Sequence, residues 1–186
     1  VGRQNRPAGL KKHEVGLKQH IGSESVKKDL YFKSELLLYQ GIALYSQGMS
    51  REGFDKLDEA KDILLEMLTK HDEKKPNKTT FAIWRTLARL YAQQGLAIMH
   101  QGRYLEARKY YDLAISYANR TDLQIIKANC LNDLAALYAR LAQFKRARNF
   151  WEQGFFIREK YLYKFYLGLS YNVGGILEYH ADRPYE

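Results

Sequence analysis

The side chains of this sequence that could perform acid–base, nucleophilic or metal chemistry are few and widely spaced. Cys130 is the only cysteine, which excludes an internal disulfide and a thiolate cage, and beside apolar Leu131 it is interpreted as a small packing residue. The five histidines share no metal-ligand spacing on one helix face: His13, His20, His71, His100 and His180. We therefore expect no catalytic residue, no metal site and no cofactor, and we interpret the histidines as surface residues.

The remaining chemical signatures are also missing. The sequence has no Gly-rich phosphate loop, no His-Glu-x-x-His pair and no Gly-x-Ser-x-Gly elbow. Apolar residues make up 46% and charged residues 27%, a balance typical of a folded, soluble protein. No stretch approaches the roughly eighteen apolar residues of a membrane span. A non-enzymatic protein of the reducing cytoplasm, without a membrane partner, is the expectation.

The elements that organise the chain are indicated by an internal repeat with an offset of forty residues. Each copy has a small residue, another seven positions later, and an aromatic residue two after that. A small residue then follows after three positions, an aromatic after four more and a small one after three more. The two copies are Gly95, Gly102, Tyr104, Ala107, Tyr111 and Ala114, and Ala135, Ala142, Phe144, Ala147, Trp151 and Gly154.

This pattern resembles the tetratricopeptide repeat family, with Tyr91 and Leu131 at the family's first aromatic or apolar position. Small residues would let two antiparallel helices approach closely, while the aromatic residues fill the space between hairpins. The long period is similar to that of sensor arrays in bacterial signal-transduction ATPases and transcriptional regulators. The resemblance implies an all-α fold, a right-handed superhelical stack of antiparallel helical hairpins.

Weaker copies flank the central two. Upstream, Gly41 and Gly48 fit a first helix, residues 57–67 fit a second, and residues 49–55 look inserted between them. Downstream, residues 166–179 fit another first helix, with Gly174 or Gly175 at the small position. The predicted array therefore covers residues 30–186, about three and a half hairpins, as part of a larger protein.

The segments outside the hairpins are predicted from their charge and from residues that end or cap helices. Residues 1–29 form a basic N-terminal arm, extended or mobile to His13 and weakly helical over 14–20, with a cap at Ser23 or Ser25. Residues 70–78 form a charged linker broken by Pro76, and Thr79 or Thr80 caps the next helix. Residues 119–122 are expected to turn between repeats.

In the family that this sequence resembles, first helices line a concave groove that binds a protein or peptide segment. Asparagines can donate to and accept from a peptide backbone, although here they could equally bond within the array. The carboxylate clamp of chaperone-docking members is absent, because Ala92, Leu96 and Asp133 stand at its positions. The candidate groove residues are Arg89, Gln93, His100, Asn129, Asn132, Asp133, Arg140, Tyr171 and Asn172.

The net charge of +9 leaves a second surface to consider. Basic residues recur on the second helices, either as a solvated convex face or as a stripe that binds nucleic acid non-specifically. We expect a sensor or interaction module of a regulatory protein, with a free-standing assembly scaffold and a nucleic-acid binder as the alternatives. The stripe comprises Arg103, Arg108, Lys109, Lys145, Arg146, Arg148, Arg158 and Lys160.

Overall fold

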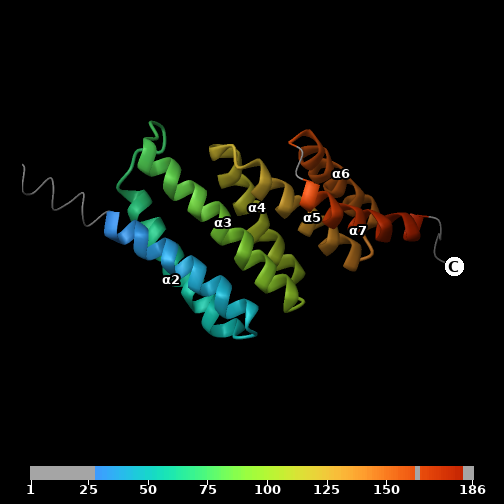
Figure 1. Ribbon diagram of the computed structural model, residues 1–186, viewed down its shortest axis with the longest axis horizontal. Coiled ribbons are helices and arrows are strands. Elements are labelled where there is room, and N and C mark those ends of the chain that lie inside the picture. The colour runs from blue at the N-terminus through green and yellow to red at the C-terminus, as the bar shows by residue number, and fades with distance from the viewer. Residues whose placement is uncertain (1–27, 162–163, 182–186) are drawn as a thin grey trace, which may run out of the picture.

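The computed structural model describes residues 28–161 and 164–181, and within these ranges every regular element is an α-helix (Figure 1). Residues 28–46 are helical and begin the array. The later helices are α2 (Ser50–Thr69), α3 (Lys78–His100), α4 (Tyr104–Thr121), α5 (Gln124–Arg140), α6 (Phe144–Lys160) and α7 (Lys164–Ala181). The predicted all-α class is confirmed.

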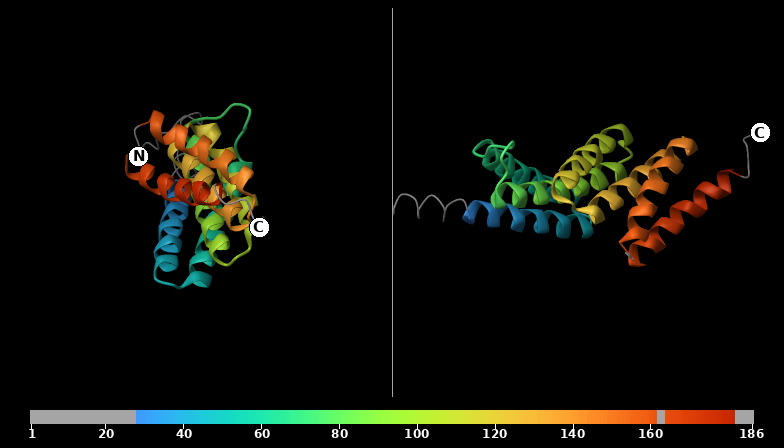
Figure 2. Two further views of the ribbon diagram at one scale, coloured as in Figure 1. Left: turned by 90° about the vertical axis from the view of Figure 1, so that its right-hand side faces the viewer. Right: turned by 90° about the horizontal axis from the view of Figure 1, so that it is seen from above.

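Consecutive helices form hairpins that follow one another along the long axis of the molecule (Figures 1 and 2). The helix over 28–46 packs on α2, α3 on α4, and α5 on α6, while α7 rests on both α5 and α6. Neighbouring first helices also touch, α3 with α5 and α5 with α7. The molecule is therefore a stack in which each hairpin contacts mainly its neighbours.

Small residues allow the close crossings that the sequence predicted. A Cβ added at Gly95 would lie 2.9 Å from the ring of Tyr111, so only glycine fits there without displacing the ring. Ala107, Ala135 and Ala147 are each 0% exposed, at the crossings of their own hairpins. The predicted role of these positions in helix packing is confirmed.

The first hairpin corrects one expectation, because nothing is inserted between its helices. Helix α2 begins at Ser50, and a Cβ on Gly53 would lie 2.8 Å from the Gly41 carbonyl oxygen. Gly53 follows Gly41 by twelve residues, the same spacing that separates Gly95 from Ala107. The first hairpin thus has the central repeat, but with two glycines at its crossing.

Helix α3 begins with a cap two or three residues earlier than predicted. Asn77 is the N-cap residue and accepts a hydrogen bond from the Thr80 backbone N–H at 2.9 Å. The Asn77 backbone N–H in turn donates to the Thr80 hydroxyl, which closes a capping box. Thr80 therefore supports the cap rather than providing it, and the linker after α2 ends at Asn77.

The turns follow the repeat, apart from the one after α4. Gly48, Gly102 and Ala142 occupy the left-handed region of the backbone at the three turns within hairpins. The turn expected over 119–122 is shorter, because α4 continues to Thr121 and only Asp122 adopts a positive φ of 54°. The Thr121 hydroxyl donates to the Tyr117 carbonyl oxygen at 3.0 Å and so extends the helix.

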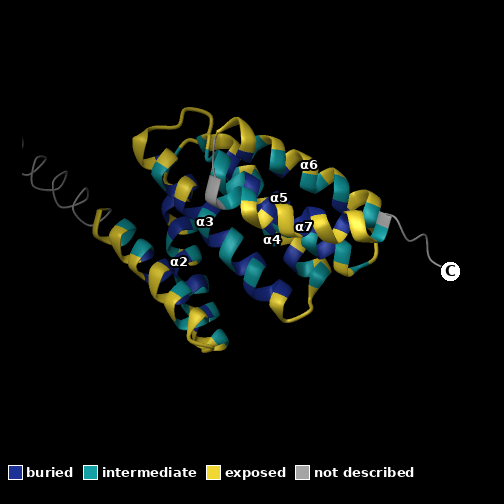
Figure 3. Cartoon of the chain, turned by 45° about the vertical axis from the view of Figure 1, so that its right-hand side comes forward, coloured by how far each residue is buried: buried dark blue, intermediate teal, exposed yellow. Residues whose placement is uncertain are grey.

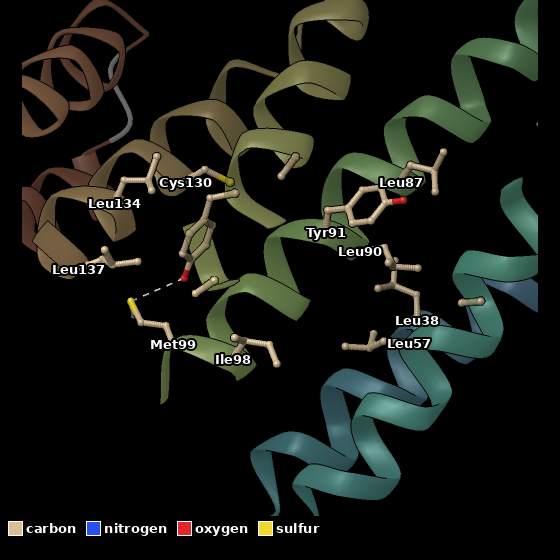
Figure 4. Packing of buried hydrophobic residues seen from close by; sticks show 14 of the residues in the cluster. Leu38, Leu57, Leu87, Leu90, Tyr91, Ile98, Met99, Cys130, Leu134 and Leu137 are labelled. Carbon is tan, nitrogen blue, oxygen red and sulfur yellow. Dashed lines mark hydrogen bonds between the residues drawn. The ribbon is translucent and has the colours of Figure 1, made fainter. Parts of the chain in front are cut away.

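One hydrophobic core runs through the hairpins. In Figure 4 the side chains of Leu38, Leu57 and Leu90 meet between the first two hairpins, while Leu134 and Leu137 lie farther along the stack. Figure 3 shows the buried residues where helices pack and the exposed ones along outer faces and turns. The predicted features of residues 1–27, including the mobile segment, the weak helix and the cap, lie outside the described residues.

Candidate partner-binding face

The first helices of successive hairpins leave side chains uncovered in the same register. Positions 89, 93, 96 and 100 of α3 are half-buried or exposed, and so are positions 129, 133, 136 and 140 of α5, while most residues between them are buried. We call this set the first-helix face. It comprises Arg89, Gln93, Leu96, His100, Asn129, Asp133, Ala136 and Arg140, and so includes six of the predicted groove residues.

The Arg89 end of this face is joined to the preceding hairpin by polar contacts. The Arg89 guanidinium lies 3.9 Å from the Glu35 carboxylate on helix 28–46. The Tyr31 hydroxyl lies 2.9 Å from the Thr86 hydroxyl and donates to Glu35 at 3.2 Å. Burial is the main cause that raises the pKa of Tyr31. Glu35 and Tyr31 were not predicted, since groove residues were assigned only from the central repeats and from residues 166–179.

His100, at the other end of α3, is also paired across hairpins. The Tyr45 hydroxyl lies 2.8 Å from His100 Nδ1, and the two rings stack with their centroids 6.0 Å apart. Both side chains remain accessible, so the pair extends the first-helix face onto helix 28–46. The forty-residue spacing could not indicate Tyr45, because the first two hairpins are separated by a longer linker.

A buried arginine lies beneath the α5 part of the face. Arg158 was placed on the outward basic stripe by the sequence, but its side chain is only 1% exposed, which corrects that assignment. Its guanidinium donates to Asn129 Oδ1 at 3.0 Å and to the Tyr166 carbonyl oxygen at 2.9 Å. It also donates to the Ser170 hydroxyl. Asn129 therefore has an intramolecular partner for its oxygen, while its amide N–H groups still have donor capacity.

Asp133 carries the most perturbed carboxylate in this region. Burial raises the pKa of Asp133 to about 7, although the charge of Arg158 and a hydrogen bond from Tyr111 act in the opposite direction. Burial likewise lowers the pKa of Arg158, and the charge of Asp133 opposes that change. The centre of the first-helix face therefore changes its charge near neutral pH.

Three predicted groove residues lie off the face. Asn132 is 7% exposed, its amide oxygen has no hydrogen-bond partner, and it lies beside Gly154 inside the hairpin. Tyr171 and Asn172 are exposed on α7. The Tyr171 ring packs edge-on against Phe155 of α6, with centroids 5.5 Å apart. Asn132 and Tyr171 therefore lie toward second helices, and Asn172 is exposed on α7.

Arg140 is the most accessible cation of the face. It is exposed at the end of α5, and no hydrogen bond or ion pair joins it to another side chain in the described residues. Cys130, by contrast, is fully buried, and burial raises the pKa of its thiol far above the usual range. Cys130 thus packs in the core. The described residues contain no group of three or more His, Cys, Asp or Glu side chains arranged to hold a metal ion.

These features define the class of the protein as a solenoid of helical hairpins with an uncovered row along its first helices. Residues 86–160, which span most of α3 through α6, match the family model described as tetratricopeptide repeat, and this part of the chain belongs to that family. Such repeats are non-catalytic and generally mediate protein–protein interactions. No curated protein matches the chain. Among the described helices, none is long and apolar enough to cross a membrane.

Proposed function

We propose that this chain binds a segment of a partner protein on its first-helix face, as the sensor or interaction part of a larger regulatory protein. The observation that carries the proposal is the shared register of uncovered residues on α3 and α5. Array stability comes from packing within and between hairpins. The accessible polar groups of this row, above all those of Gln93 and Arg140, are therefore available to a partner.

The chemistry of the face suits an extended peptide. Gln93 and Asn129 offer amide groups that can pair with a peptide backbone, and Leu96 and Ala136 offer small apolar contacts between them. Arg140 adds an accessible cation at one end. A segment with a carboxylate near one end and modest apolar side chains would complement this arrangement.

The proposal is tested by selecting peptides from a display library on the purified chain and titrating the selected peptides against variants. Arg140→Ala and Gln93→Ala should each weaken binding by about 1–2 kcal/mol, since each removes a hydrogen-bonding group. Arg51→Ala, at an exposed position on α2, is the matched control and should leave affinity unchanged. The free energy of unfolding of all three variants should stay within about 0.5 kcal/mol of that of the unchanged chain, as for surface substitutions in general.

Selected peptides that bind Arg140→Ala and Gln93→Ala as tightly as the unchanged chain would move the site off this face. The sensor role needs a second measurement, in which the selected peptide is added to the larger protein that contains this array. A change in that protein's activity, lost with Arg140→Ala, supports a sensor. Peptide binding without any change in activity supports the assembly scaffold instead.

A further inference from the structure

A second candidate site lies between α4 and α6, the second helices of the two central hairpins. It is a cleft of about 540 Å³, within the usual size range of ligand pockets. Only one of its lining residues, Tyr138, comes from a first helix, so the cleft is separate from the first-helix face. The lining comprises Arg108, Tyr138, Lys145, Arg146, Asn149, Phe150 and Gln153.

The same cleft exists one repeat earlier with different chemistry. The preceding cleft, of about 530 Å³, lies along α4 and is lined by Leu105, Glu106, Lys109, Tyr110 and Leu113. Forty residues later these positions hold Lys145, Arg146, Asn149, Phe150 and Gln153. Two leucines and a glutamate are thus replaced by a lysine, an arginine and a glutamine. Because the fold accepts leucine and glutamate at these places, the need to solvate a helix does not explain the basic residues.

The cations of the α4–α6 cleft are only partly neutralised. Arg108 lies 3.5 Å from Asp112 on its own helix, with both side chains about half exposed. Arg146 donates to the neutral Gln143 amide at 2.9 Å. Within the part of the chain that the structure describes, neither Lys145 nor Arg146 has a carboxylate partner. The cleft lining holds three cations and no acidic side chain.

The aromatic residues favour a peptide over a nucleic acid as the ligand. Binding of single strands relies on open aromatic faces onto which bases stack. Tyr138 is only 4% exposed, with Phe150 parallel to it at 5.4 Å and the Arg146 guanidinium 5.8 Å from its centroid. The Tyr138 ring is therefore not available to a base. Asn149 and Gln153 can instead pair with a peptide backbone.

We propose that the α4–α6 cleft binds an acidic peptide segment, whose side-chain carboxylates or phosphates are held by Lys145, Arg146 and Arg108. Arginine pairs with such oxyanions through its planar fork, and lysine adds a point charge. The partner therefore contacts the second helices, on a surface that the first-helix face leaves free. Such a site would let one chain hold two segments at once.

The test is fluorescence anisotropy with labelled short peptides at physiological salt, using a Glu-rich peptide, its Gln counterpart and a phosphoserine version. The Glu-rich or the phosphoserine peptide should bind and the Gln peptide should not. Lys145→Ala should weaken binding about two- to fivefold and Lys145→Ala/Arg146→Ala about tenfold, in line with partly exposed ion pairs. The matched double variant Lys109→Ala/Lys160→Ala removes the same charge elsewhere and should keep binding within about twofold.

A gain-of-function variant guards against loss of binding through misfolding. Leu105→Lys/Glu106→Arg transfers the two basic residues into the preceding cleft and should increase the amount of acidic peptide bound. Arg140→Ala, on the first-helix face, should leave this binding unchanged. Equal binding by the two double alanine variants would overturn the proposal. So would binding of a single-stranded oligothymidine that depends on Lys145 when no peptide binds, since the ligand would then be nucleic acid.

Discussion

The hairpins α3–α4 and α5–α6 have the same backbone plan and use it differently. Both cross at small residues, turn through one left-handed residue and leave the same register of the first helix uncovered. They differ at positions of the second helix whose side chains contact the neighbouring hairpin. Ala118 of α4 and Arg158 of α6 are equivalent and both buried, yet one is a methyl group and the other a guanidinium. A repeat therefore constrains the register and burial of a position more strongly than the size or polarity of its side chain.

The reason for the difference lies in what each residue faces. Ala118 is buried and has no polar side-chain atom to satisfy. The Arg158 guanidinium, by contrast, donates to oxygen acceptors of Asn129 on α5 and of Tyr166 and Ser170 on α7. The guanidinium thus joins the second central hairpin to the helix that follows it. A buried charge of this kind is tolerated because both terminal nitrogens of the guanidinium donate hydrogen bonds, although its Nε has no partner in the described residues.

The contrast between the two hairpins is tested most directly by giving α6 the residue of α4. Arg158→Ala should lower the free energy of unfolding by about 3–5 kcal/mol. The substitution removes the cation near Asp133, leaves the oxygen acceptors on α5 and α7 without their donor, and opens a cavity. Chemical denaturation measures the loss, and hydrogen exchange of α7 amides tests whether that helix separates first.

Arg148→Ala is the matched control, since Arg148 also links α6 to α7, through Glu178 at 2.7 Å, but is 36% exposed. An exposed pair contributes at most about 1 kcal/mol. If both alanine variants lost the same free energy of unfolding, the burial of Arg158 would contribute nothing to stability. The main contrast between the hairpins would then disappear.

The pH dependence of stability should come from the α5–α6 hairpin. The pKa of Asp133 is raised to about 7 in the folded chain, against about 4 for an unfolded aspartate. The folded state therefore binds the proton more tightly, so Asp133 favours folding at pH 4 and loses that contribution as the pH rises toward 7. The loss is up to about 4 kcal/mol at pH 8, since each pKa unit corresponds to about 1.4 kcal/mol.

The substitution Asp133→Asn keeps the shape of the side chain but removes the carboxyl group that titrates. Thermal melts between pH 5 and pH 8 should show a steep fall for the unchanged chain and a flatter profile for the variant. The equivalent position on α3 is Gln93, which does not titrate, so Gln93→Ala should leave the slope as it is. Parallel slopes for the chain and Asp133→Asn would contradict the raised pKa.

The comparison also shows how far sequence could predict this molecule. The α3–α4 and α5–α6 hairpins were found from their small and aromatic residues, because close crossings demand those sizes. The first hairpin was misread, since Ser50 stands where Tyr104 and Phe144 stand and the spacing from Gly41 to Gly53 was overlooked. A repeat is recognised by its bulky residues and can persist without them.

The candidate face was predicted only in part for a geometric reason. Asn129 and Asp133 are four residues apart, which turns a helix about 40° beyond one full circle, whereas Asn132 is three apart and falls about 60° short. That difference moves Asn132 toward Gly154 and into the hairpin. Arg158 could not be placed from its own helix, because its polar partners come from other helices. Its equivalence with Ala118 was the available signal.

The turns within the two hairpins differ in the residue that adopts the left-handed conformation. Ala142 has a φ of 56° where Gly102 has 77°, so the α5–α6 hairpin holds an alanine in the left-handed region. A Cβ costs about 1 kcal/mol in that conformation, and glycine loses part of this advantage through its greater freedom when unfolded. Ala142→Gly should therefore stabilise the chain by about 0.5 kcal/mol, and Gly102→Ala should destabilise it by about the same amount. A Cβ at Gly102 would have no atom within 4 Å, so backbone conformation alone decides the result. Urea denaturation of both variants measures it, and changes of the same sign would show that the two turns are not equivalent.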